Sequence, residues 1–148
     1  MTDTIDASGF VLRRTYRASP ERLFRAFTDP DEMRRWYAPV VGWEVSHAEV
    51  DPRLGGGYHL EFGPPGSDQI IEKGTFREFD PPNRLVFEVA LSGGIDEATR
   101  VTVEFVDHGE ETEVVVSETG YSSEEITRRH AGGWNTMLEQ LRGVVAPT

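Results

Sequence analysis

The segment SSEEITRRHAGGWNTMLEQLRGVV, residues 122–145, decides the fold of this chain. Apolar side chains recur in it at steps of three and four residues, which places them on one face of an α-helix. Ser122 and Glu125 have the spacing of a capping box, so we expect the helix to begin there. Its long apolar face requires another layer to cover it. That face consists of Ile126, His130, Trp134, Met137, Leu141 and Val144.

Upstream of this helix the apolar period changes to two, which is typical of strands that are covered on one face only. Short segments rich in Gly, Pro, Asp and Asn separate the strands, so neighbouring strands should pair antiparallel. We therefore expect an α+β fold, in which a curved antiparallel sheet of about six to seven strands wraps around the C-terminal helix. The predicted strands cover residues 10–17, 43–50, 58–62, 69–79, 85–91, 98–106 and 112–119.

Two short helices are expected after the first strand. Ser19 is a natural N-cap and Pro20 suits the first helical position, with apolar residues following at helical spacing as far as Phe27. Thr28-Asp29-Pro30 ends this helix and starts a second one, which Pro39 closes. The second helix would carry Met33, Trp36 and Tyr37 on one side.

Glycines mark three further features. Gly55-Gly56-Gly57 joins two strands with no helix behind it, so it predicts a tight turn with positive φ and not a phosphate-binding loop. Gly74, inside a strand pattern, predicts a bulge or bend. Gly132-Gly133 inside the last helix predicts a close approach of that helix to a strand, because two helical glycines otherwise cost stability.

Composition limits the classes of function. The 148 residues fit one domain, residues 1–148, with a flexible N-terminus over about residues 1–8. The formal net charge of −11 argues against nucleic acid or an anionic membrane as partner. The chain has no cysteine, which excludes disulfides and thiolate chemistry. We see no signal peptide and no apolar stretch of about 20 residues, so the cytoplasm is the expected location.

Five segments resemble, in order, the proteins similar to the C-terminal domain of the activator of the Hsp90 ATPase. That family lies within the START and Bet v 1-like (SRPBCC) superfamily of helix-grip domains. The resemblance implies a pocket between sheet and helix, since superfamily members bind lipids, hormones, polyketides or flavonoids and some are cyclases. The eukaryotic co-chaperone has a separate N-terminal domain, which we expect to be absent because the first family strand starts near residue 10. The segments are residues 18–30, 35–36, 51–58, 74–87 and 130–141.

We expect the pocket to bind a small hydrophobic or aromatic molecule without catalysis, cofactor or metal. A cyclase or dehydratase using an inward carboxylate, His47 or a tyrosine is one alternative. A protein-interaction module like the co-chaperone, with a filled interior, is another, although we expect no Hsp90-type chaperone as partner; a homodimer stays open. The candidate pocket-lining residues are Trp36, Tyr37, Trp43, His47, Tyr58, Leu60, Phe62, Phe76, Phe87, Phe105, His130, Trp134, Met137 and Leu141.

Several polar residues have two interpretations. Glu72 and Glu118 are strand carboxylates that could point inward and act as acid or base. His47 would share the face of Trp43 and Val45, and so lie either at the pocket or, more simply, in water at a sheet edge. The His47/Glu49 and His59/Glu61 pairs should face opposite ways, which would prevent them from forming one metal site.

Overall fold

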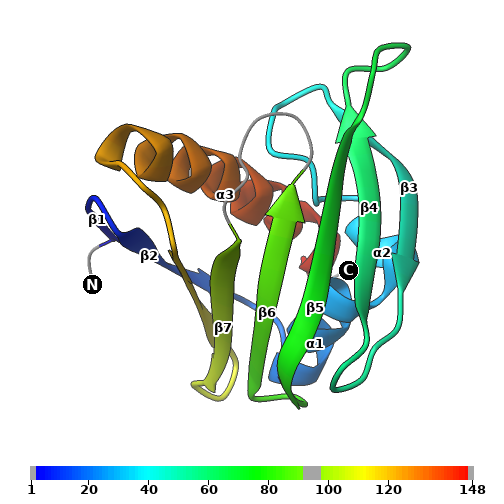
Figure 1. Cartoon of the computed structure of the whole chain (residues 1–148). Helices are drawn as coiled ribbons and strands as arrows, with labels where there is room; N and C mark the ends of the chain where they lie inside the picture. The colour runs from blue at the N-terminus through cyan, green and yellow to red at the C-terminus, as the bar shows by residue number, and fades with distance from the viewer. Residues whose placement is uncertain (1–2, 92–97, 147–148) are drawn as a thin grey trace.

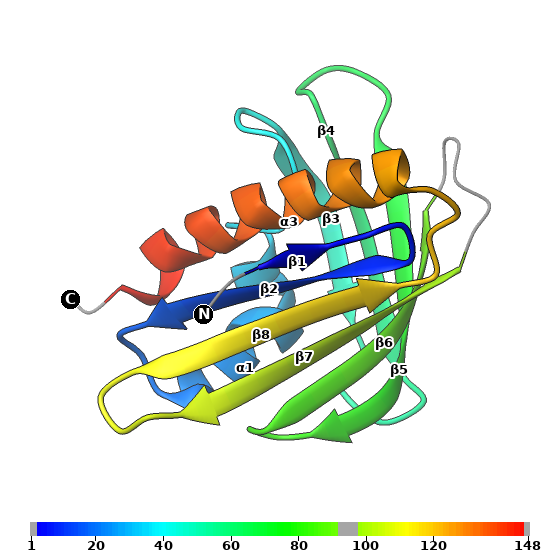
Figure 2. The ribbon, with the colours of Figure 1, turned by 90° about the vertical axis from the view of Figure 1, so that its left-hand side faces the viewer.

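The computed structural model describes residues 3–91 and 98–146, and it confirms the predicted architecture of an antiparallel sheet with a long C-terminal helix. The sheet bends around α3, while α1 and α2 close one end of it (Figures 1 and 2). In chain order the elements are β1 Thr4–Ile5, β2 Gly9–Tyr16, α1 Pro20–Thr28, α2 Pro30–Met33, β3 Glu44–Val50, β4 Gly57–Gly63, β5 Ile70–Asp80, β6 Arg84–Leu91, β7 Thr99–Asp107, β8 Thr112–Thr119 and α3 Glu124–Val145.

The sheet has eight strands in the order β1-β2-β8-β7-β6-β5-β4-β3, and every neighbouring pair is antiparallel. The count exceeds the predicted one because Thr4 and Ile5 pair with Val11 and Phe10. This part of residues 1–8 is therefore an edge strand and not a free tail, whereas Met1 and Thr2 lie outside the described residues. No helix among residues 3–91 and 98–146 is long and apolar enough to cross a bilayer.

Side-chain caps fix the ends of the helices. The Ser19 hydroxyl accepts a hydrogen bond from the Arg22 amide, as predicted for α1. The α-helical part of the second helix is shorter than predicted, because α2 ends at Met33 and hydrogen-bonded turns carry the chain on to Tyr37. The predicted start of α3 is one residue early, since Ser123 and not Ser122 caps the helix.

The predicted turn at Gly55 is confirmed, whereas the bulge predicted at Gly74 is absent from that residue. Gly55 has the expected positive φ of 81° in its turn. Gly74 is no bulge: it pairs in register with Tyr58, and the irregularity in β5 lies between Phe76 and Glu78. A Cβ on Gly74 would lie 2.0 Å from Cε2 of the Tyr58 ring. Gly74 is thus needed because the Tyr58 ring lies across its backbone.

Replacing Gly74 with alanine is expected to lower the free energy of unfolding by about 1–3 kcal/mol, since the new methyl group overpacks a buried ring. Gly132→Ala is the control, because a Cβ there meets no heavy atom within 4 Å and alanine favours a helix. Urea unfolding of both variants measures the difference. Equal stability of the two variants would show that Tyr58 moves aside at no cost.

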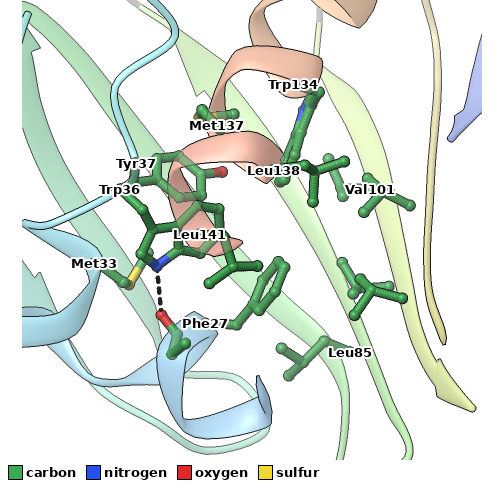
Figure 3. Close-up of a cluster of buried hydrophobic side chains, with 14 of the residues drawn as sticks. Phe27, Met33, Trp36, Tyr37, Leu85, Val101, Trp134, Met137, Leu138 and Leu141 are labelled. Carbon is green, nitrogen blue, oxygen red and sulfur yellow. Dashed lines mark hydrogen bonds between the residues drawn. The ribbon is translucent and has the colours of Figure 1, made fainter. Parts of the chain in front are cut away.

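One part of the core lies where α1 and α2 meet the sheet and α3. Phe27, Met33 and Trp36 pack there against Leu141 and Leu85 (Figure 3). The Trp36 indole N–H donates to the Ala26 carbonyl oxygen at 2.9 Å, so this buried polar group has a partner. The core therefore fills one end of the space between sheet and helix.

Candidate functional site

The other end of that space is a cavity of about 290 Å³ between the sheet and α3. Strands β4 to β8, α3 and the segment after α2 all contribute to its wall. Two exposed lining residues, Val40 and Arg129, place the mouth of the cavity at the surface. The wall consists of Tyr37, Pro39, Val40, Trp43, Phe62, Ile70, Glu72, Val89, Leu91, Val101, Glu118, Arg129, His130, Gly133, Trp134 and Met137.

The structure places the predicted pocket residues in two groups. Six of them line the cavity: Tyr37, Trp43, Phe62, His130, Trp134 and Met137. Seven others belong to the filled core and do not line it: Trp36, Tyr58, Leu60, Phe76, Phe87, Phe105 and Leu141.

The inner face of a single strand can contribute both core residues and cavity-lining residues. On β6, Leu85 and Phe87 lie in the core, while Val89 and Leu91 line the cavity. The α3 face divides in the same way, with Trp134 at the cavity and Leu141 in the core. The position along each element therefore decides whether an inward residue meets another side chain or open space.

His47 is the predicted pocket residue that the structure moves elsewhere. The pairing of β3 with β4 shifts between Val45 and His47, so Val45 and Ala48 both face inward. His47 then lies in solvent on the outer face of an edge strand, where its side chain is 42% exposed. The prediction that it shares the inner face of Val45 is wrong, and the simpler interpretation of a histidine at a sheet edge is correct.

The same bulge brings the two histidine pairs together, contrary to the expectation that they face opposite ways. The His47 and His59 rings lie 5.7 Å apart between centroids. His47 contacts Glu49 at 3.4 Å, and His59 contacts Glu61 at 2.9 Å. Within the described parts of the chain, no three His, Cys, Asp or Glu side chains are placed to hold a metal ion, and these four are no exception.

Glu72 on β5 is an inward carboxylate, as one of the two interpretations predicted. It is 8% exposed and lines the cavity. Its Oε2 atom accepts hydrogen bonds from the Tyr58 hydroxyl at 2.6 Å and the Tyr37 hydroxyl at 3.0 Å. Gly74 makes this geometry possible, because the Tyr58 ring crosses it to reach Glu72.

Glu118 on β8 is the second inward carboxylate, at 4% exposure. Its Oε1 atom accepts a hydrogen bond from the Trp134 indole N–H at 3.0 Å, and its Oε2 atom accepts a short one from the Thr99 hydroxyl. The carboxyl group thus ties β8 to β7 and to α3 at the cavity wall.

Burial dominates the acid–base properties of both groups. It raises the pKa of Glu72 to about 7, with the charge of Glu118 adding to the rise and the Tyr58 and Tyr37 donors opposing it. Burial also raises the pKa of Glu118, against hydrogen bonds from Thr99, Tyr121 and Trp134. The pKa of each partner tyrosine is raised well above 10, again first by burial. The cavity therefore holds two carboxyl groups that titrate above their ordinary range.

Two residues of α3 lie beside the cavity mouth. Arg129 pairs with Glu125 at 3.6 Å on the exposed side of the helix. The His130 ring lies 4.9 Å from the Tyr121 ring, and burial lowers its pKa, followed by the nearby Arg129 charge.

Of the two helical glycines, Gly133 lies at a close approach of α3 to another segment, and Gly132 does not. A Cβ on it would lie 3.0 Å from the Pro39 Cβ, so α3 approaches the segment after α2 and not a strand. Gly132 is exposed, and nothing in the structure explains why it is glycine.

Part of the cavity wall could not be predicted from the sequence. Alternation placed Val89, Leu91 and Val101 on the inner face without showing that they border open space. Pro39 and Val40 lie in an irregular segment, where no periodicity is available. Arg129 lies outside the apolar stripe of α3. The missed lining residues are Pro39, Val40, Ile70, Val89, Leu91, Val101, Arg129 and Gly133.

A bent antiparallel sheet closed around one long helix, with a cavity left between them, defines a helix-grip domain. The chain belongs to the family of activator of Hsp90 ATPase homolog 1-like proteins, whose family model matches residues 17–146. The predicted family is therefore confirmed.

Solved structures share this fold. Protein CV1439 from Chromobacterium violaceum is 24% identical, with 95% of this chain and 99% of that chain covered and a TM-score of 0.83. Mll3558 from Rhizobium loti is 29% identical, with 95% and 99% covered and a TM-score of 0.75. Ms6760 from Mycobacterium smegmatis is 16% identical, with 100% and 98% covered and a TM-score of 0.79. Comparison with curated proteins finds no match.

Proposed function

We propose that this protein binds a small hydrophobic or aromatic molecule in the cavity between the sheet and α3, without transforming it. The observation that carries the proposal is the cavity itself, a space of about 290 Å³ in a fold whose sheet and helix would otherwise pack together. Its wall is mostly apolar and aromatic, with few polar groups, which is the usual composition of a small-molecule site. Burial of apolar ligand surface would supply the affinity.

Filling the cavity should abolish binding. Ile70 lines the cavity and Ile71 follows it on β5, so the two side chains point to opposite faces. We expect Ile70→Trp to weaken binding of an apolar aromatic probe such as 3-ethylindole at least 10-fold. Ile71→Trp is the matched control and should change the affinity less than about 2-fold. Isothermal titration calorimetry measures both, and equal effects of the two substitutions would contradict binding in this cavity.

Native mass spectrometry of protein purified from its own host tests the same proposal without choosing a probe. Retention of a small molecule by the wild-type protein, and its loss from Ile70→Trp, are the expected results. Absence of any retained molecule, together with failure to bind 3-ethylindole and its amine and carboxylate analogues, would overturn the proposed function.

Acid–base catalysis in the same cavity is a second candidate, favoured by the buried Glu72 carboxyl with the Tyr58 hydroxyl at 2.6 Å. It predicts that the retained molecule is chemically changed by the wild-type protein and unchanged by Glu72→Gln. The cavity does not match the filled interior that the protein-interaction hypothesis predicted, so we do not propose that function.

A further inference from the structure

Glu72 and Glu118 line one cavity, and neither has a cationic partner in the described parts of the chain. No ion pair among residues 3–91 and 98–146 includes either carboxyl group. Both carboxyl groups line the same cavity, and the charge of Glu118 adds to the rise in the pKa of Glu72. A buried carboxylate without a countercharge is costly, and two in one site are more so. A bound molecule that supplied positive charge would remove this cost.

The surroundings of the two carboxyl groups are arranged as hydrogen-bond donors. The Trp134 indole N–H can only donate, and it points at Glu118. The hydroxyl groups of Tyr37 and Tyr58 both donate hydrogen bonds to Glu72. Such donors stabilise the ionised form of a carboxyl group. The protein therefore provides for negative charge at this place in the cavity.

One carboxyl oxygen at the cavity has no hydrogen-bond partner in the described parts of the chain. The Oε1 atom of Glu72 accepts no hydrogen bond from any described residue, although Glu72 is only 8% exposed and lines the cavity. The buried Tyr121 hydroxyl is a further donor beside Glu118, and its hydrogen bond opposes the rise in the pKa of that carboxyl group. The charge of Glu118 contributes to raising the pKa of Tyr121, after burial, so this hydroxyl lies near that carboxyl group. A buried polar group without a partner indicates a missing one.

Aromatic rings enclose the same place. The Tyr37 and Trp134 rings meet edge to face with centroids 5.6 Å apart, and each is hydrogen-bonded to one of the two carboxyl groups. Trp43 and Phe62 complete the aromatic wall of the cavity. Faces of aromatic rings attract cations, most strongly where water is excluded.

We propose that the ligand is an apolar or aromatic molecule that carries a protonated amine, with the nitrogen held by Glu72 and Glu118 and the apolar frame by the surrounding rings. This inference rests on the proposed function, since it specifies the chemical class of the molecule bound there. The amine donates charge-assisted hydrogen bonds to the carboxylates, one of them to the free Oε1 of Glu72.

The test compares by calorimetry at pH 8 three probes that share the 3-ethylindole frame: neutral 3-ethylindole itself, tryptamine with a terminal ammonium group and indole-3-propionate with a terminal carboxylate. Tryptamine is expected to bind at least 10-fold more tightly than 3-ethylindole, and indole-3-propionate more weakly than both. Equal affinities of tryptamine and 3-ethylindole would overturn the inference. Tightest binding of the anion would also overturn it and would point to Arg129 and His130 at the mouth instead.

Glutamine variants locate the effect. Glu72→Gln and Glu118→Gln should each reduce the affinity for tryptamine at least 10-fold and that for 3-ethylindole less than 2-fold. Glu49→Gln, whose carboxylate is 70% exposed on the outer face of β3, should change neither affinity. Thermal unfolding of each variant shows whether it is folded, and 3-ethylindole binding shows whether its cavity is intact. Undiminished tryptamine binding in both inner variants would overturn the inference.

The outcomes separate this inference from the proposed function. Binding of 3-ethylindole without preference for the amine leaves the proposed function standing and overturns the charge assignment. Failure of all three probes, with a neutral molecule retained in native mass spectrometry, also leaves the proposed function standing and overturns the charge assignment. Failure of all three with nothing retained overturns both.

Discussion

Replacing Trp36 with alanine is expected to lower the free energy of unfolding by about 3–5 kcal/mol. The side chain is 1% exposed and is the largest of the fully buried ones. Its ring contacts Phe27 at 4.7 Å and Tyr37 at 5.1 Å between centroids, and its N–H donates to the Ala26 carbonyl. Alanine would leave a void there and an unpaired carbonyl. Chemical denaturation at pH 7 measures the loss.

The backbone around Trp36 limits how far the void can collapse. The Gln140 side chain on α3 donates to the carbonyl oxygens of Trp36 and Ala38 at 2.9 and 3.0 Å, which holds this segment against the helix. Val41→Ala is the control in the same segment, because Val41 is 81% exposed and its loss should cost less than about 0.5 kcal/mol. A Trp36→Ala cost below about 1 kcal/mol would mean that the core end is not packed as described.

Glu72→Gln is expected to stabilise the protein at pH 8 by about 3 kcal/mol. The pKa of Glu72 rises from its usual 4.5 to about 7 on folding, and each pKa unit corresponds to about 1.4 kcal/mol. Between pH 4.5 and 7 the unfolded chain loses this proton while the folded protein keeps it, so stability falls as pH rises through this window. Above pH 7 the folded protein contains the buried charge, and glutamine removes it.

Denaturant unfolding at pH 4.5 and pH 8 checks this sign. At pH 4.5 the variant and the wild-type protein should differ little, because the folded protein then holds a protonated Glu72 and has no buried charge there to remove. Glu88→Gln should have the opposite sign at pH 8, since hydrogen bonds from Arg77 and Arg100 lower the pKa of Glu88. A gain for Glu72→Gln that is the same at both pH values would show that packing and not charge is responsible.

The sequence predicts which residues face inward because side-chain direction follows backbone period. Alternation along residues 85–91 correctly placed Leu85, Phe87, Val89 and Leu91 on one face. Where that face stops being core and starts to border a cavity depends on the elements opposite it. That boundary is set by α1, α2 and Trp36, whose positions a local pattern does not contain.

His47 was placed on the wrong face because one extra residue in β3 interrupts the alternation of inward and outward side chains. A bulge between Val45 and His47 changes the face of every later residue in β3, and no glycine or proline marks it in the sequence. Gly74 shows the converse case. A glycine that suggested a bulge serves instead to seat the Tyr58 ring, which depends on a neighbouring strand and not on the local sequence.

The two carboxylates were predictable as inward-facing but not as a site. Glu72 and Glu118 each occupy an inward position in an alternating strand, so their direction follows from the period. They lie 46 positions apart in the chain and on strands separated in the sheet by β6 and β7. The fold brings them to one cavity, together with donors from the segment after α2 and from α3.

A crystal structure of the protein soaked with tryptamine at pH 8 tests whether the cavity between the sheet and α3 holds a ligand. We expect density for one molecule between the sheet and α3, with its indole against Tyr37 and Trp134. Its nitrogen should lie within about 3.2 Å, the usual hydrogen-bond limit, of Glu72 or Glu118. A structure in which α3 lies flat on the sheet, with the cavity closed and the probe absent from it, would contradict ligand binding at this place.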